Sequence, residues 1–195
     1  MMYKSFFKRP LDIIGSLVLL CICLIPIIII SILTYISLGS PIFFKQKRSG
    51  ENKNQFKIIK FRTMRNYVDG DNDSMRLTPL GSTLRKYSLD EMPQLINVLI
   101  GEMSLVGPRP LLPKFNDHYS KEQEKRFLVK PGMTGLAQIR GRNFLSWDDR
   151  FKADIQYIDN ITFTNDIKIL FKTIIVVLGS KNFIQGDLED KFKNL

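Results

Sequence analysis

The segment from Leu11 to Leu38 constrains the fold more than any other part of the chain. It is strongly apolar, and Asp12 is its only charged residue. A helix of this length could cross a hydrocarbon core of about 30 Å. A cleaved signal peptide would be shorter and would end at a small-residue cleavage site, which this stretch does not contain. The sequence therefore predicts a membrane segment.

Pro26 lies near the middle of this segment. Proline removes one helical hydrogen bond and disfavours helical geometry at the preceding residue, Ile25, so we expect a break there. Each half would be about 20 Å long, too short to cross the bilayer. Basic residues flank both ends and favour the cytoplasmic side: Lys4, Lys8 and Arg9 before the segment, and Lys45, Lys47 and Arg48 after it. Together these features predict a re-entrant helix-break-helix, with a single kinked span as the alternative.

The region from Ile42 to Phe61 has a different pattern. Short alternating apolar and basic residues flank the polar stretch SGENKN, which predicts a β-hairpin. The sequence FKIIKFRTM, which begins in the second arm, places Lys60 and Arg62 among apolar residues, a pattern also found in nucleic-acid-binding segments. Because the N-terminus is expected to lie in lipid, we expect no nucleic-acid partner.

The stretch from Leu84 to Pro113 contains the candidate reactive residues. Asp90 and Glu91 stand at the start of an expected helix, and Ser88 with Glu91 also matches a helix capping box. Pro93 weakens that alternative, since proline is favoured as the first helical residue and the capping box would place it later. A helix start favours ionised carboxylates. Such a carboxylate can act as a nucleophile or bind Mg²⁺.

Cations surround this pair in the sequence. Arg85 precedes it, and Arg109 is held between two prolines, which lowers the entropy cost of a bidentate phosphate contact. The stretch KPGMTGLAQIRGRN adds Arg140 and Arg142, with glycines that permit close backbone approach, although a basic β-turn would have the same composition. The net charge of +10 also predicts anionic partners.

Two helices are expected near the C-terminus. Ser146 precedes the first, in which Phe151, Ile155 and Ile158 recur at helical intervals. The second extends over residues 166–178, with lysines on one side and a nearly continuous apolar surface. A buried core helix and a basic amphipathic helix in the membrane interface both fit this pattern.

Several of these motifs occur together in a known family. SLDEMPQLINVLIGEMSLVGPRPLLP, with KFRTM before it and KPGMTGLAQIRGRN after it, resembles the bacterial sugar transferase family of monotopic phosphoglycosyl transferases. The similarity extends from Phe7 to about Leu178. Members often break their membrane helix at a Ser-Pro pair, whereas Ile25 precedes Pro26 in this chain.

The resemblance implies a reaction and assigns residues to it. A phospho-sugar would pass from a UDP-sugar to undecaprenyl phosphate with release of UMP, through a covalent intermediate on Asp90. Glu91 would assist, and Mg²⁺ would be held by Asp90 or Glu91. The expected phosphate-binding cations are Lys60, Arg62, Arg85, Arg109, Arg140 and Arg142.

We therefore expect an α+β protein in three parts. Residues 1–39 would form the re-entrant anchor, residues 40–180 the catalytic domain with its hairpin and interfacial helices, and residues 181–195 a polar tail. The expected location is the cytoplasmic face of the bacterial inner membrane, at the first membrane step of glycoprotein or surface-polysaccharide synthesis. The sequence leaves the sugar and the oligomeric state open.

Two other classes of function fit the sequence less well. A non-catalytic membrane-tethered module that binds anionic lipid or nucleic acid would explain the charge and the anchor, but not the carboxylate pair among arginines. A lipid-linked acyltransferase would need a nucleophile paired with a histidine base. The single histidine, His118, has no aspartate four residues later, because that position is Glu122.

Overall fold

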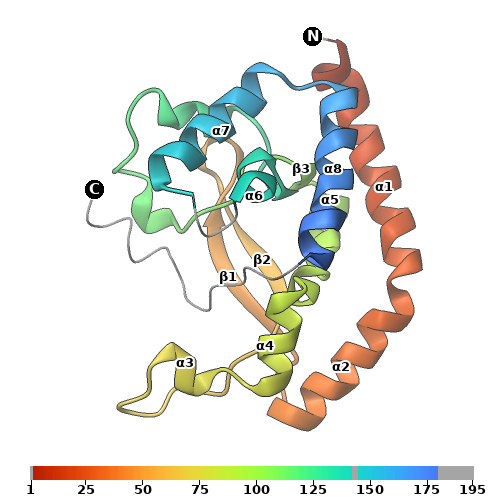
Figure 1. The fold of residues 1–195 in the computed structure, drawn as a ribbon, viewed down its shortest axis with the longest axis vertical. Helices are drawn as coiled ribbons and strands as arrows, with labels where there is room; N and C mark the ends of the chain where they lie inside the picture. Colours follow the sequence, from red (N-terminus) through yellow and green to blue (C-terminus); the bar gives the residue numbers. More distant parts are fainter. Residues whose placement is uncertain (1, 142–144, 180–195) are drawn as a thin grey trace.

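The structure, a computed structural model, describes residues 2–141 and 145–179. Helices surround a two-stranded hairpin, which confirms the predicted α+β class (Figure 1). The elements are η1 (Tyr3–Phe7), α1 (Lys8–Ile22), α2 (Leu24–Leu38), β1 (Phe43–Ser49), η2 (Glu51–Lys53), β2 (Gln55–Phe61), α3 (Asp73–Arg76), α4 (Pro79–Lys86), η3 (Leu89–Glu91), α5 (Gln94–Ile100), β3 (Ser104–Val106), η4 (Pro113–Phe115), η5 (Gln123–Leu128), β4 (Gly132–Thr134), α6 (Leu136–Gly141), α7 (Trp147–Asp159) and α8 (Phe163–Leu178).

The N-terminal apolar segment forms two helices that meet at a bend of 62°. The predicted break is present, but α1 ends at Ile22 and Pro26 lies in the first turn of α2, so the break lies at Cys23, three residues before the proline. Pro26 has no N–H for the carbonyl of Ile22, and its ring would clash with that carbonyl, so the chain bends between them. Ile25 remains helical. In the described part of the chain, only this bent pair, and no single helix, is long and apolar enough to cross a membrane.

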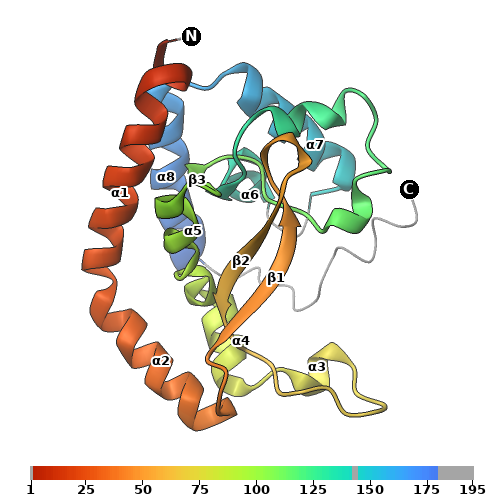
Figure 2. The ribbon, with the colours of Figure 1, turned by 180° about the vertical axis from the view of Figure 1, so that it is seen from behind.

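Both arms of the bent pair contact the rest of the protein. The α1 helix packs against α5 and β3, while α2 packs against α4 and β2 (Figures 1 and 2). Ile30 of α2 is buried with Phe61 and Leu84, and Leu19 of α1 packs against the main core. The segment therefore packs along one side of the molecule instead of projecting from it. The predicted domain boundary after residue 39 stays a prediction, and the predicted tail at 181–195 lies outside the described residues.

The predicted hairpin is confirmed, with β1 and β2 antiparallel from Phe43 opposite Phe61 to Ser49 opposite Gln55. Asn97 of α5 attaches the helix to this hairpin. Its fully buried amide accepts a hydrogen bond from the backbone N–H of Ile59 at 3.1 Å and donates to the carbonyl of Lys57 at 2.9 Å. The amide thus continues the hydrogen bonding of β2 at its edge, and α5 keeps a fixed distance from the strand.

A second, parallel pair of strands was not predicted. Strands β3 and β4 pair within the stretches 101–113 and 130–143, with Ser104 opposite Gly132 and Val106 opposite Thr134. A Cβ atom on Gly132 would lie 2.0 Å from the nitrogen of Gly107, so only glycine permits this approach. The glycine at position 132 therefore does permit a close approach, and the group that approaches it is the backbone of Gly107. Three-residue strands among glycines and prolines carry too little alternation to be recognised.

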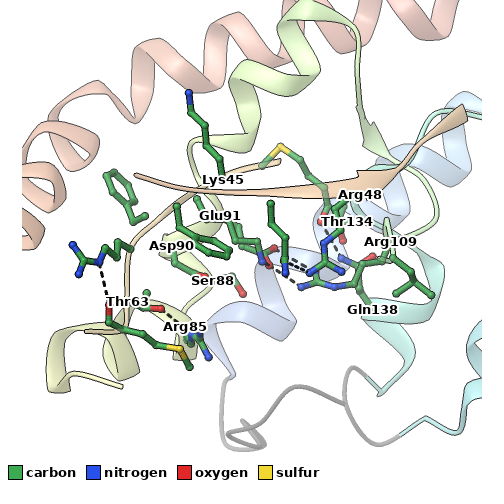
Figure 3. Close-up of a pocket in the computed structure, with 18 of the residues that line it drawn as sticks. Lys45, Arg48, Thr63, Arg85, Ser88, Asp90, Glu91, Arg109, Thr134 and Gln138 are labelled. Atoms are coloured by element: carbon green, nitrogen blue, oxygen red, sulfur yellow. Dashed lines mark hydrogen bonds and ion pairs between the residues drawn. The ribbon is translucent and has the colours of Figure 1, made fainter. Parts of the chain in front are cut away.

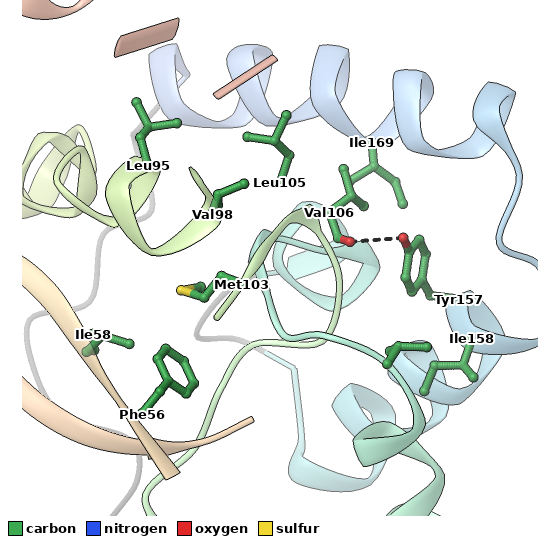
Figure 4. Close-up of a cluster of buried hydrophobic side chains, with 11 residues drawn as sticks. Phe56, Ile58, Leu95, Val98, Met103, Leu105, Val106, Tyr157, Ile158 and Ile169 are labelled. Carbon is green, nitrogen blue, oxygen red and sulfur yellow. Dashed lines mark hydrogen bonds between the residues drawn. The ribbon is translucent and has the colours of Figure 1, made fainter. Parts of the chain in front are cut away.

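The main core lies between β2, α5, β3, α7 and α8 (Figure 4). The α7 helix begins after Ser146 as predicted, and the Ser146 hydroxyl accepts from the N–H of Asp149. The α8 helix begins three residues earlier than predicted, because Thr162 caps it. Ile169 of α8 is buried in the core, whereas several apolar residues of α8 are exposed: Phe163, Phe171, Ile174, Ile175 and Leu178. Thus α8 is a core helix with a second apolar face that no other element covers in the described structure.

Candidate active site

A cavity of about 790 Å³ lies between the hairpin, η3, the loop after β3, and α6 to α8 (Figure 3). Its walls differ in chemistry. One wall carries Asp90 and Glu91 together with several cations, and another is formed by apolar residues of β4, α6 and α8. The residues labelled in Figure 3 include Lys45, Arg48, Thr63, Arg85, Ser88, Asp90, Glu91, Arg109, Thr134 and Gln138. The carboxylate pair and most of the predicted cations therefore share one cavity.

Asp90 and Glu91 lie in η3, a single 3₁₀ turn immediately before α5. Ser88 adopts a left-handed conformation with φ 54° and makes no side-chain cap, so the capping-box alternative is wrong. Pro93 directly precedes α5, close to the first helical position that the sequence favoured. This local geometry keeps the carboxylates out of a regular helix and presents them to the cavity.

Glu91 is bound by two cations. Lys60 Nζ lies 2.7 Å from Glu91 Oε1, and Arg109 donates to the same oxygen at 2.8 Å and to Oε2 at 3.4 Å (Figure 3). Burial alone would raise the pKa of the Glu91 carboxyl, but the charges of Arg109 and Lys60 outweigh it and hold the pKa well below its usual range. Glu91 is therefore ionised and brings two cations from separate elements to one point.

Asp90 is in a different electrostatic environment, although it is the adjacent residue. Its exposed fraction is 7%, and within the described residues its carboxylate has no hydrogen bond or ion pair at bonding distance. Burial raises the pKa of Asp90, as does the charge of Glu91, against the opposing effects of Lys60, Arg85 and Arg109. The predicted preference for ionisation at the helix start is thus outweighed by burial. Asp90 faces the cavity with an uncommitted carboxylate.

The raised pKa of Asp90 predicts a pH dependence. The role of ionised nucleophile that the sequence predicts for Asp90 implies that kcat/KM should fall on acidification at a higher pH than an ordinary aspartate, with pKa 3.8, would give. Glu91→Gln removes a negative charge that raises the Asp90 pKa, so the acid limb of the pH profile should move to lower pH, even if the variant has a lower rate. The measurement is kcat/KM from pH 4 to 8. The control is Glu124→Gln, at a glutamate that pairs with Lys53. If the acid limb of the pH profile has the same position in Glu91→Gln as in the wild type, its assignment to Asp90 is contradicted.

The other predicted cations differ in placement. Arg85 Nε donates to the hydroxyl of Thr63 at 3.0 Å, which holds the guanidinium at the cavity. Arg62 also lines the cavity, and its guanidinium donates to Asn66 and to the backbone of Leu38. Arg140 is exposed on α6 and does not line the cavity. Arg142 lies outside the described residues.

Sequence reasoning missed a buried ion pair in the cavity wall. Arg126 of η5 lies 3.1 Å from Asp154 of α7 and donates to the backbone carbonyl of Arg109 at 2.6 Å. Burial raises the pKa of Asp154 to about 6, although Arg126 opposes this effect. Arg126 belongs to the stretch KEQEKR, which looks like an exposed charged run. The apolar FLV after it was the only local sign of burial.

The carboxylates could also contribute to a Mg²⁺ site. Mg²⁺ is often held by one or two carboxylates together with substrate phosphates. Among the described residues no group of three or more His, Cys, Asp or Glu could hold a metal ion by itself. The uncommitted Asp90 carboxylate fits a site that a substrate diphosphate completes. Glu91 could join it only if Lys60 or Arg109 moved away.

Comparison with known proteins agrees with this arrangement. Residues 3–180 match the family model described as bacterial sugar transferase. The chain belongs to the bacterial sugar transferase family. The match covers every element described above, so the carboxylate pair, the hairpin and the bent helices of this sugar transferase all lie inside the region that defines the family.

Several relatives are similar over most of this sugar transferase. "Uncharacterized sugar transferase EpsL" of Bacillus subtilis is 44% identical, over 91% of this chain and 90% of that protein. "UDP-glucose:undecaprenyl-phosphate glucose-1-phosphate transferase" of Caulobacter vibrioides is 35% identical, over 90% of this chain and 71% of that protein. "Undecaprenyl-phosphate galactose phosphotransferase" of Salmonella typhimurium is 38% identical over 90% of this chain, which spans only 41% of that longer protein.

Proposed function

We propose that this enzyme transfers a phospho-sugar from a UDP-sugar to undecaprenyl phosphate and releases UMP. The observation that carries the proposal is the contrast within the carboxylate pair. Asp90 faces the cavity without an ion pair to any described residue, while Glu91 holds Lys60 and Arg109 beside it. The Caulobacter and Salmonella relatives are both named as transferases that act on undecaprenyl phosphate, which supports the same reaction. We infer that this transfer is the first membrane step of glycoprotein or surface-polysaccharide synthesis.

In the first half of the reaction, an oxygen of Asp90 attacks the β-phosphorus of the UDP-sugar. A bond forms between Asp90 and that phosphorus, the bond to the bridging oxygen breaks, and UMP leaves with the bonding electrons. Arg109, Lys60 and Arg85 line the cavity beside Asp90 and stabilise the charge that develops on the phosphates. The product is a phospho-sugar attached to Asp90.

In the second half, a phosphate oxygen of undecaprenyl phosphate attacks the same phosphorus. The bond to Asp90 breaks, and the aspartate carboxylate is regenerated. Two displacements allow a water-soluble donor and a lipid acceptor to react in turn, without a ternary collision. As long as Glu91 does not bind a metal ion, it holds Lys60 and Arg109 in position beside Asp90.

We also propose that Mg²⁺ takes part, held by Asp90 and, after a shift of its cations, Glu91, together with the substrate diphosphate. When bound, it would neutralise charge on the leaving phosphate. Treatment with EDTA should therefore reduce UMP release at least tenfold, and added Mg²⁺ should restore it. Full activity after EDTA treatment, with metal removal verified by elemental analysis, would contradict this proposal.

The proposed location is the cytoplasmic face of the bacterial inner membrane, with the bent helix pair re-entrant in the lipid. The exposed apolar side chains of α1, α2 and α8 support this placement. Single cysteines at residues 4 and 45, in a variant without Cys21 and Cys23, should both be labelled only from the cytoplasmic side in intact cells. Labelling of either cysteine from the outside would contradict the re-entrant placement and show that the helix pair crosses the membrane.

The reaction itself is tested by following UMP release. Purified protein in nanodiscs receives Mg²⁺, undecaprenyl phosphate and each member of a panel of UDP-sugars. We expect one or a few UDP-sugars to give UMP and a lipid-linked phospho-sugar in equal amounts. Salt-sensitive binding of anionic lipid or nucleic acid without UMP from any donor would instead support the non-catalytic module.

A further inference from the structure

The first turns of α1 carry three charged side chains that point toward the catalytic part of the protein. Lys8 pairs with Asp166 of α8 at 2.6 Å. Arg9 donates to the carbonyls of Val98 and Leu99, at 2.6 and 2.9 Å, near the end of α5. These side chains therefore attach the anchor to the protein, although the sequence suggested that they would act mainly on membrane orientation.

Asp12 is the third of these residues and reaches deepest. Its exposed fraction is 5%, and its Oδ1 accepts a hydrogen bond from the backbone N–H of Leu105 at 3.0 Å. Leu105 is the middle residue of β3, between Ser104 and Val106, which pair with β4. Because alternate residues of a strand direct their N–H groups to opposite sides, the Leu105 donor faces away from β4. Asp12 thus provides the partner that a neighbouring strand would otherwise provide.

The strand held by Asp12 leads directly to Arg109. The Gly107 N–H donates to Thr134 at 2.9 Å, and the Pro108 carbonyl accepts from Gly132 at 2.9 Å. The carbonyl of Arg109 accepts from Arg126 at 2.6 Å. These bonds fix the chain on the β4 side, whereas Asp12 fixes it on the α1 side. The backbone from Leu105, which Asp12 holds, to Arg109 therefore has little freedom to move.

We propose that Asp12 is a positioning residue for Arg109. By holding β3 through the Leu105 N–H, it places the Arg109 guanidinium against Glu91 and against the substrate phosphate. An anionic residue in the apolar anchor thereby contributes to the geometry of the phosphate site. The kinetic part of this inference rests on the proposed reaction, while the hydrogen bond can be tested without it.

Replacement of Asp12 by Ala and by Asn separates the hydrogen bond from the charge. Asp12→Ala removes the acceptor and should raise the KM for the UDP-sugar roughly tenfold, the effect of losing one buried hydrogen bond. Asp12→Asn keeps an oxygen acceptor and should stay within about twofold of the wild type. Ile14→Ala, at an exposed position on the same helix, is the control and should leave KM unchanged.

A double-mutant cycle tests whether the effect passes through Arg109. In the Arg109→Lys background, the effect of Asp12→Ala on KM should fall to less than about threefold, because the side chain that Asp12 positions has already been altered. A general loss of fold would instead act additively in both backgrounds. Additive effects, or an Asp12→Asn variant as impaired as Asp12→Ala, would overturn the proposal.

Amide hydrogen exchange supplies a readout that needs no reaction. The Leu105 amide should exchange at least tenfold faster in Asp12→Ala than in the wild type, and at the wild-type rate in Asp12→Asn. Unchanged exchange in Asp12→Ala would overturn the inference even if the enzyme is active. Failure of the wild type to release UMP would instead reject the proposed function and leave the exchange result valid. If Asp12→Ala does not fold, the test rests on Asp12→Asn. The proposal requires this variant to keep slow exchange of the Leu105 amide and a normal KM, and fast exchange or a raised KM would overturn it.

Discussion

Asp90→Asn should reduce UMP release by roughly 10³-fold or more, the scale of loss when a nucleophile is removed. The amide has nearly the same size as the carboxylate and fits the same buried position, but it cannot form the acyl phosphate. Because the Asp90 side chain makes no ion pair among the described residues, its replacement should leave the fold intact. The measurement is the initial rate of UMP formation with undecaprenyl phosphate in excess.

Mass spectrometry distinguishes a nucleophile from a residue that only helps binding. Incubation with the UDP-sugar but without lipid acceptor should add the mass of one phospho-sugar to the wild type, and nothing to Asp90→Asn. Asp117→Asn, at an exposed aspartate, should behave as the wild type in both assays. Near-normal turnover by Asp90→Asn would exclude the covalent scheme.

Arg126→Met should destabilise the protein by about 3–5 kcal/mol, the usual cost of removing one partner of a buried ion pair. The side chains of Arg126 and Asp154 are only 4% and 6% exposed, so the variant leaves a carboxylate buried without its cation. For a chain of this size, that loss corresponds to a melting temperature lower by roughly 6–20 °C. Thermal unfolding in detergent, followed by circular dichroism, measures it.

The neighbouring residue provides a matched control. Lys125 also forms an ion pair, with Glu122, but those side chains are 43% and 61% exposed. Lys125→Met should therefore leave the melting temperature nearly unchanged. A double variant, Arg126→Met with Asp154→Leu, should recover part of the loss, because no unpaired charge remains buried. Equal destabilisation by Arg126→Met and Lys125→Met would contradict this account.

The sequence predicted features that depend on local pattern. Alternating apolar and basic residues on either side of a polar stretch were sufficient to predict the β1–β2 hairpin. Apolar residues at helical intervals after a serine cap were sufficient to predict the start of α7. Pro93 correctly indicated that the helix after Asp90 begins late. The grouping of Asp90 and Glu91 with cations was also predictable, since Arg85 and Arg109 lie near them in sequence.

Other features could not be predicted because they depend on contacts between distant residues. The β3–β4 pairing requires close approach of Gly107 and Gly132, which no local pattern indicates. The ionisation of Asp90 depends on burial, and the state of Glu91 depends on Lys60, which comes from another element. The helix break lies at Cys23 because the steric effect of a proline acts on the preceding turn.

The contacts at both arms of the bent helix pair bear on attempts to make a water-soluble catalytic fragment. Deleting residues 1–39 would expose the Leu105 N–H and the terminal carbonyls of α5, and would leave Asp166 without Lys8. It would also uncover Phe61 and Leu84 where Ile30 now covers them. A fragment designed to avoid the lipid would thus lose part of its own interior. Solubility is better sought by substituting outward-facing residues of this helix pair, such as Ile14 and Ile25, while keeping its inner face.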